Sequence, residues 1–149
     1  MFTSWLRDPR MLACAAILLS TSVTASENAT TEDRLAAYNR HYPAISYPDL
    51  RKAVDAGEVF LLDTNRGETY TMGHLPDAYS LTDRATLESQ LPILKNYPIV
   101  VYCGGPQCTS WFAGADFAAA RGYTNIMHFR GGLKDWKDQG GSLATRKTE

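Results

Sequence analysis

Two cysteines in a glycine-rich segment are the residues of this sequence best suited to chemistry. Cys103 and Cys108 enclose the uncharged sequence Gly-Gly-Pro-Gln, which follows the apolar run Ile-Val-Val-Tyr at 99–102. A thiolate is a strong nucleophile toward sulfur, and backbone N–H groups gathered in a tight turn lower the pKa of a thiol. Two glycines let the chain curl after Cys103 with few steric limits. The pattern therefore predicts an anionic sulfur at Cys103, surrounded by N–H donors.

The expected donors are backbone N–H groups of the residues that follow Cys103. They belong to Gly104, Gly105, Gln107, Cys108 and Thr109. Pro106 has no N–H, and a helix predicted over 109–121 points the positive end of its dipole at the same place. A thiolate held there can attack a sulfane sulfur, and the same donors would hold the persulfide product. The simpler interpretation of Cys103, a small buried residue that ends a strand, is disfavoured by the two glycines and the helix start.

Three roles are open for Cys108 on sequence alone. It can be a bystander at the start of the helix, it can close a disulfide with Cys103, or it can attack a Cys103 persulfide as a resolving cysteine. Zinc binding by the pair is disfavoured, because no nearby pair of histidines completes a ligand set. We expect no metal and no organic cofactor.

Apolar runs that alternate with helical segments predict an α/β fold. The runs at 59–62, 99–102 and 126–129 are typical of strands buried on both faces of a parallel sheet. Helices are predicted from near Thr30, from Ser46, over 85–91 and over 109–121. Ligands of such sheets bind beyond the carboxyl ends of the strands, which is where Asp63 and Cys103 are expected.

Three segments, in the right order, resemble the rhodanese (sulfurtransferase) family. Residues 63–78 resemble its first signature, which ends in Gly-His-Leu-Pro-Asp-Ala, and residues 99–110 resemble its active-site strand and loop. The sequence Arg-Gly-Gly-Leu-Lys-Asp-Trp at 130–136 resembles its closing Gly-Gly-x-x-x-Trp signature. The resemblance implies a central parallel sheet flanked by helices on both faces. It also implies that Cys103 is a catalytic cysteine that carries sulfur as a persulfide.

Other residues near the predicted site are interpreted as structural. The resemblance implies that the ring of His74 braces the turn from Gly73 to Pro76. Asp63 and Arg130 are interpreted as residues that brace loops at the mouth of the site. The pair Gly131-Gly132 allows a close backbone approach just before the last helix.

Departures from the family pattern bear on the substrate. Relatives active on thiosulfate often have Arg or Lys in the active loop, whereas no charge lies between Cys103 and Cys108 here, and Cys108 itself stands where many single-domain relatives have Arg. Asn65 likewise replaces an arginine of the first signature. The sequence therefore predicts weak use of thiosulfate. Phosphatases and arsenate reductases of related fold need an Arg six residues after the cysteine; Thr109 stands there, which disfavours their chemistry.

The first 25 residues have the pattern of a cleavable signal peptide. Arg7 and Arg10 precede a short apolar run at 11–19, and Val-Thr-Ala at 23–25 suits cleavage after Ala25. The run is too short for a permanent membrane span, and a retained N-terminal anchor is the alternative. Cleavage removes Cys14, so that Cys103 and Cys108 would be the only thiols of a periplasmic protein, in a compartment that permits disulfides.

The remaining chain divides into three parts. Residues 26–45 are interpreted as an N-terminal leader and helix, 46–141 as the rhodanese-like domain, and 142–149 as a C-terminal tail. Lys and Arg total 15 against 16 for Asp and Glu, so there is no excess positive charge for nucleic-acid binding.

Taken together, the sequence predicts an exported sulfurtransferase that passes sulfane sulfur from a small sulfur-containing donor to a thiol acceptor. That acceptor could be a periplasmic redox protein. Two alternatives stay open: a non-catalytic rhodanese-like module that binds a partner, and a thiol–disulfide redox protein that uses Cys103 and Cys108. A partner-binding module would tolerate the loss of Cys103, whereas a sulfurtransferase and a redox protein would not. Of the three, only the redox protein would also need Cys108.

Overall fold

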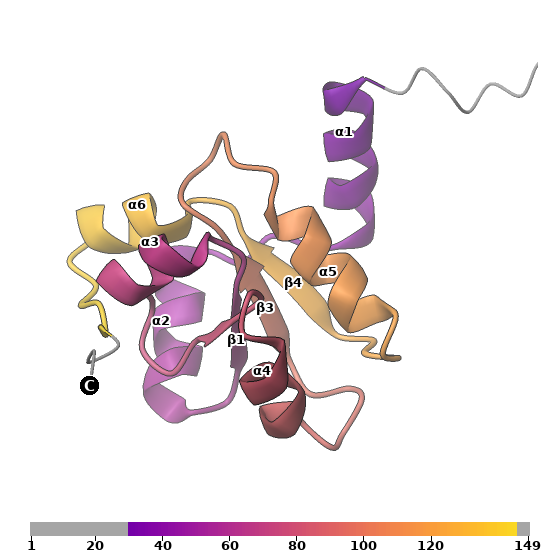
Figure 1. Ribbon diagram of the computed structural model, residues 1–149. Helices are drawn as coiled ribbons and strands as arrows, with labels where there is room; N and C mark the ends of the chain where they lie inside the picture. The colour runs from indigo at the N-terminus through magenta and orange to yellow at the C-terminus, as the bar shows by residue number, and fades with distance from the viewer. Residues whose placement is uncertain (1–29, 146–149) are drawn as a thin grey trace, which may run out of the picture.

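The computed structural model of the protein describes residues 30–145, so the predicted signal peptide lies outside the described residues (Figure 1). In chain order the elements are α1 (Thr31–His41), α2 (Tyr47–Ala56), β1 (Phe60–Asp63), α3 (Gly67–Met72), β2 (Tyr79–Ser80), α4 (Arg84–Gln90), β3 (Ile99–Tyr102), α5 (Trp111–Ala119), β4 (Ile126–Phe129) and α6 (Gly132–Asp138). Within residues 30–145, no helix has the length and apolar character needed to cross a bilayer.

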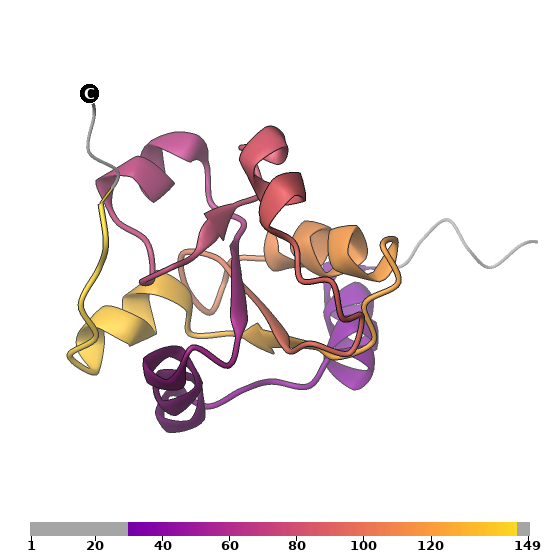
Figure 2. The same ribbon diagram turned by 90° about the horizontal axis from the view of Figure 1, so that it is seen from below.

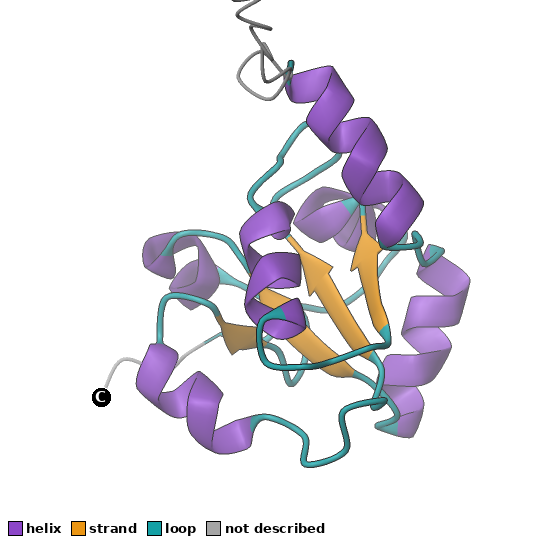
Figure 3. Cartoon of the chain, turned by 90° about the vertical axis from the view of Figure 1, so that its right-hand side faces the viewer, coloured by secondary structure: helices purple, strands orange, loops and turns teal. Residues whose placement is uncertain are grey.

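The strands form one parallel sheet in the order β2-β1-β3-β4. Strand β3 lies in the middle, with Tyr102 opposite Asp63 of β1 on one side and opposite Phe129 of β4 on the other. The strand arrows in Figure 3 accordingly point the same way. All residues of β1 and β3 are buried, as expected for apolar runs covered on both faces. The predicted α/β class with a parallel sheet is confirmed.

Helices cover both faces of this sheet, which divides the core into two layers. Along β3, Val101 packs with residues of α4 and α5, while Val100 packs with residues of α2 and α6. Figures 1 and 2 show α4 and α5 on one side of the strands and α2 and α6 on the other. The prediction of helices on both faces is therefore confirmed, and the β3–α5 connection runs from the centre of the sheet to one of these layers.

Helix α1 packs on the outer side of α5. The ring of Tyr38 stacks on Phe112 with centroids 4.1 Å apart, and its hydroxyl donates to the carboxylate of Asp116. The expected cap at Thr30 is confirmed, because its side chain accepts from the N–H of Asp33 and the Asp33 carboxylate accepts from the N–H of Thr30. This helix therefore braces the helix that follows the cysteine loop.

Two short elements were not predicted from the sequence, and a third is shorter than expected. Strand β2 has only two residues, and α3 buries only Tyr70, so neither gives a periodic apolar signal. Helix α5 begins at Trp111 rather than at Thr109, because the N–H of Phe112 bonds to the carbonyl of Thr109, three residues back, in a tighter turn. Cys108 and Thr109 thus belong to the loop and not to the helix.

A buried histidine ties β4 to the segment after α1. The ring of His128 stacks on Trp111 with centroids 4.1 Å apart, and its Nδ1 lies 3.0 Å from the carbonyl oxygen of Tyr42. Its Nε2 is buried and has no hydrogen-bond partner among residues 30–145. Burial lowers the pKa of His128, and the nearby charge of Arg130 acts in the same direction. The neutral ring, which donates from Nδ1 to Tyr42, is the form that the fold stabilises.

We therefore predict that the free energy of unfolding decreases as the pH falls. The unfolded chain protonates this histidine near its ordinary pKa of 6.5, whereas the folded chain protonates it only at lower pH. Stability from this residue is thus complete above pH 6.5 and is lost between that value and the lower folded-state pKa. The His128→Phe variant keeps a ring on Trp111. Urea unfolding at several pH values should show that its free energy of unfolding falls less steeply below pH 6.5 than that of the wild type. An unchanged slope would contradict the prediction.

Candidate active site

The two central strands bring the predicted site residues to one edge of the sheet. Asp63 ends β1 directly opposite Tyr102, and Cys103 follows as the first residue of the loop. Both the N–H and the hydroxyl of Thr64 donate to the carbonyl oxygen of Tyr102, each at 2.9 Å. These bonds join the carboxyl ends of β1 and β3, so the position at which the chain leaves the sheet at Cys103 is fixed.

The loop is closed by a disulfide between Cys103 and Cys108, whose Cα atoms lie 6.3 Å apart. The N–H of Cys108 donates to the carbonyl oxygen of Gly105 at 3.0 Å, which forms a turn with Pro106 and Gln107 exposed at its tip. Of the roles left open for Cys108, the structure shows the disulfide partner. Cys103 is only 3% exposed, whereas Cys108 is partly exposed.

Four of the five expected N–H donors remain available in this loop. Within residues 30–145, no protein acceptor is hydrogen-bonded to the N–H of Gly104, Gly105, Gln107 or Thr109, whereas the N–H of Cys108 is used by the turn. The carbonyls of Cys103 and Gly104 accept hydrogen bonds from Leu133 and Lys134 of α6. Because a trans peptide points its N–H opposite to its carbonyl, the N–H groups of Gly104 and Gly105 point away from α6.

The approach of α6 to the loop depends on a glycine. Gly132 has φ +59°, and a Cβ placed on it would overlap the carbonyl oxygen of Cys103 and lie 2.8 Å from the nitrogen of Gly105. The N–H groups of Leu133 and Lys134 reach the Cys103 and Gly104 carbonyls at 2.9 and 3.0 Å. The close approach expected at Gly131-Gly132 is thus present, and its target is the cysteine loop.

A buried polar group lies beside the loop at the end of β1. Asp63 Oδ1 accepts from the N–H and the side-chain amide of Asn65, at 2.7 and 2.8 Å, and the amide oxygen of Asn65 lies close to Gly104. Burial raises the pKa of Asp63, and the Tyr102 hydroxyl and Asn65 oppose part of that rise. The Tyr102 hydroxyl also accepts the N–H of Leu75 at 3.1 Å. Sequence reasoning gave neither Asn65 nor Tyr102 a role, because neither residue type signals a bracing function.

The family model of the rhodanese-like domain matches residues 46–139. The chain belongs to the rhodanese-like family. No curated protein sequence matches it significantly.

Solved structures with the rhodanese-like fold are similar over most of the chain. A thiosulfate sulfurtransferase of Pseudomonas aeruginosa is 23% identical with a TM-score of 0.61, over 77% of this chain and 22% of that longer one. A human single-domain sulfurtransferase is 21% identical with a TM-score of 0.53, over 66% of this chain and 98% of that chain. At these identities the likeness shows the shared fold.

A third similar structure is a Rhodopseudomonas palustris protein of unknown function, described as a possible tyrosine phosphatase. It is 22% identical with a TM-score of 0.60, over 81% of this chain and 97% of that one. In this rhodanese-like domain Thr109 stands six residues after Cys103, where phosphate-binding arginine would be needed. The loop therefore does not support phosphatase chemistry.

The structure gives His74 and Arg130 different surroundings. His74 is buried, its ring stacks on Tyr70 with centroids 3.9 Å apart, and Nδ1 lies 2.8 Å from the carbonyl oxygen of that residue. Its backbone pairs with Ala144 in both directions. These contacts hold the ring and the backbone of His74 in the turn from Gly73 to Pro76. Arg130 is exposed after β4. In the described chain no cluster of His, Cys, Asp and Glu could hold a metal ion.

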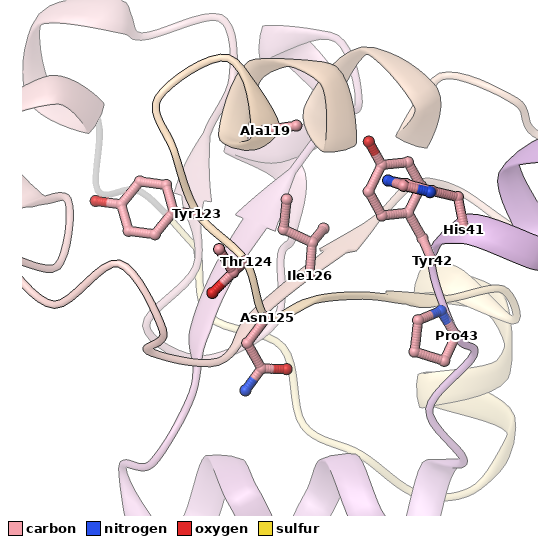
Figure 4. Close-up of a pocket in the computed structure, with 8 residues that line it drawn as sticks. All are labelled: His41, Tyr42, Pro43, Ala119, Tyr123, Thr124, Asn125 and Ile126. Atoms are coloured by element: carbon pink, nitrogen blue, oxygen red, sulfur yellow. The ribbon is translucent and has the colours of Figure 1, made fainter.

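A pocket of about 400 Å³ lies away from the cysteine loop (Figure 4). Its lining comes from the end of α1, the end of α5 and the start of β4, and includes His41, Tyr42, Ala119 and Asn125. The pocket is lined by Ile126 at the start of β4, so it lies at the amino ends of the parallel strands, whereas Cys103 lies at their carboxyl ends. It does not serve the cysteine.

We predict that Gly132→Ala destabilises the protein more than Gly57→Ala does. Both glycines have positive φ, +59° and +67°, but nothing lies within 4 Å of a Cβ placed on Gly57. Both variants carry the conformational cost of about 1 kcal/mol. Only Gly132→Ala adds a steric clash of about 1–3 kcal/mol. Urea unfolding of both variants measures the difference, and equal losses would show that the loop does not need this close approach.

Proposed function

We propose that this protein is a sulfurtransferase of rhodanese type, in which Cys103 carries sulfane sulfur as a persulfide. The observation that carries the proposal is the position of Cys103: it follows the central strand, at the family's active-site loop, next to N–H groups without protein acceptors. Donors of this kind stabilise a thiolate before the reaction and a persulfide anion after it. The sulfurtransferases of similar fold support the same chemistry.

The transfer has two steps. The Cys103 thiolate attacks the sulfane sulfur of a donor, a new S–S bond forms, and the rest of the donor leaves with the electron pair of the broken bond. A thiol acceptor then attacks the outer sulfur of the persulfide and takes it away, which regenerates the Cys103 thiolate. Neither step needs a metal or an organic cofactor.

The disulfide sets a condition on this cycle. In the disulfide form the sulfur of Cys103 is bonded to Cys108 and is not a thiolate, so it cannot attack a sulfur donor. The protein must therefore be reduced before Cys103 can accept sulfur. The active form is the dithiol, and the disulfide form is inactive.

The charges near the loop favour donors of low charge over thiosulfate. The loop itself is uncharged, and Lys134, the cation whose Cβ lies nearest to Gly105, forms an ion pair with Asp138. The loop itself offers a dianion such as thiosulfate no charged group, whereas an organic persulfide carries at most one negative charge on its sulfur. We therefore propose that the natural donor is an organic persulfide.

Reduced protein should accept one sulfur atom on Cys103 from a small-molecule persulfide, and either keep it or release it as sulfide, whereas oxidised protein should neither gain sulfur nor release sulfide. The Cys103→Ser variant cannot form the disulfide and keeps only the Cys108 thiol, so it should take up sulfur much more slowly than the reduced wild type, because a hydroxyl at neutral pH is not a sulfur nucleophile. Intact mass spectrometry before and after reduction reads the outcome. Sulfur transfer to cyanide by Cys103→Ser at the wild-type rate would disprove the proposal and favour a partner-binding module.

We also propose that the protein works in the periplasm, where the partners would be a sulfur donor and a thiol acceptor. The supporting observations are the signal-peptide pattern of residues 1–25 and a disulfide between the two cysteines that cleavage would leave. We predict that the mature protein begins at Ser26 and is recovered in the periplasmic fraction. N-terminal sequencing and fractionation test this, and an intact Met1 on cytoplasmic protein would contradict it.

A further inference from the structure

The cysteine loop brings the two sulfur atoms into bonding contact. Their residues have Cα atoms 6.3 Å apart, which lies within the range of about 4.4–6.8 Å that disulfides require. The start of the loop is anchored to α6 through the Cys103 and Gly104 carbonyls, and its far side is shaped by the bond from Cys108 N–H to Gly105. Cys108 can therefore reach the sulfur atom of Cys103 itself, the inner sulfur of any persulfide formed there.

The two cysteines differ in access from solvent. Cys103 is 3% exposed and packs in the core layer that contains Trp111, while Cys108 is partly exposed beside the exposed turn at Pro106 and Gln107. An external thiol acceptor therefore meets Cys108 before it meets Cys103. Cys108 is also tethered five residues away, so its local concentration at the persulfide exceeds that of a dissolved thiol.

Building on the sulfurtransferase function proposed above, we propose that Cys108 is a resolving cysteine and that the protein reduces sulfane sulfur to sulfide. The Cys108 thiol passes its proton, through water, to the outer sulfur of the persulfide anion, and its thiolate attacks the Cys103 sulfur. The Cys103–Cys108 bond forms, the bond to the outer sulfur breaks, and hydrosulfide leaves with that electron pair. Two electrons from two thiols have then reduced one sulfane sulfur, and the disulfide seen in the structure is the product.

The cycle is completed by a dithiol reductant. Its first thiolate attacks the more exposed sulfur, that of Cys108, and the Cys103 thiolate leaves into the N–H groups of Gly104 and Gly105. The second thiol of the reductant then attacks the first reductant sulfur, which is bonded to Cys108 in the mixed disulfide, and the Cys108 thiolate leaves. The reductant leaves as a disulfide, so the reducing equivalents for each sulfide come from one dithiol.

The test follows the fate of one sulfur atom under anaerobic conditions. Fully reduced protein, freed of reductant, is mixed with one equivalent of a small-molecule persulfide, and sulfide and intact mass are measured over time. The wild type should release one sulfide and lose two hydrogen atoms. The Cys108→Ser variant should keep one added sulfur and release sulfide at least about tenfold more slowly. Ser110→Ala, which changes an exposed hydroxyl without a capping bond, should behave as the wild type.

The outcomes separate the two proposals. If Cys108→Ser gains sulfur but the wild type holds its sulfur equally long, Cys108 does not resolve the persulfide, and the sulfurtransferase proposal stands. If the wild type keeps the added sulfur on Cys108, the thiol accepts sulfur instead of displacing sulfide, and the reductase proposal is again overturned. If neither protein gains sulfur and no sulfide forms, the sulfurtransferase function itself fails.

Discussion

Two hydrogen bonds between the last helix and the cysteine loop determine how the reactive end of this molecule is built. The N–H groups of Leu133 and Lys134 lie at the start of α6, where helix donors have no partner within the helix, and they take the carbonyls of Cys103 and Gly104 as acceptors. Satisfying these carbonyls on one side turns the following N–H groups to the other. These two hydrogen bonds thus place the loop and also set the direction of its donors.

The residues of the closing signature, 130–136, act together to position α6 against the cysteine loop. Gly132 gives the space in which backbone meets backbone, and Trp136, fully buried one turn later, fixes the helix in the core beneath β3. The indole N–H of Trp136 donates to the carbonyl of Ser142 at 2.8 Å, so the chain after α6 is also held. Gly132 at the loop and Trp136 in the core are both needed to keep the start of α6 within hydrogen-bonding distance of the Cys103 and Gly104 carbonyls.

Much of the fold followed from the sequence, because its strands are continuous apolar runs. Residues 99–102 and 126–129 form β3 and β4 with the predicted bounds, and β1 is displaced by one residue, so that it ends at Asp63 itself. Cys103 at the end of β3 could be located for the same reason. What could not be predicted depends on contacts between distant segments. Asn65 next to Gly104, and the turn that uses the N–H of Cys108, leave no periodic or compositional trace.

The folded unit extends past the segment that matches the family. On one side, Pro43 and Ile45 exchange hydrogen bonds with His128 along the open edge of β4. On the other, Ala144 pairs with His74, and Leu143 packs against Gly73. Cutting the gene at the boundaries of the family match, residues 46–139, would therefore bare the outer edge of the sheet and strip a strand partner from the His74 turn. Open edges pair with other chains. A fragment so trimmed would be prone to self-association, and a usable expression fragment must retain both flanking segments.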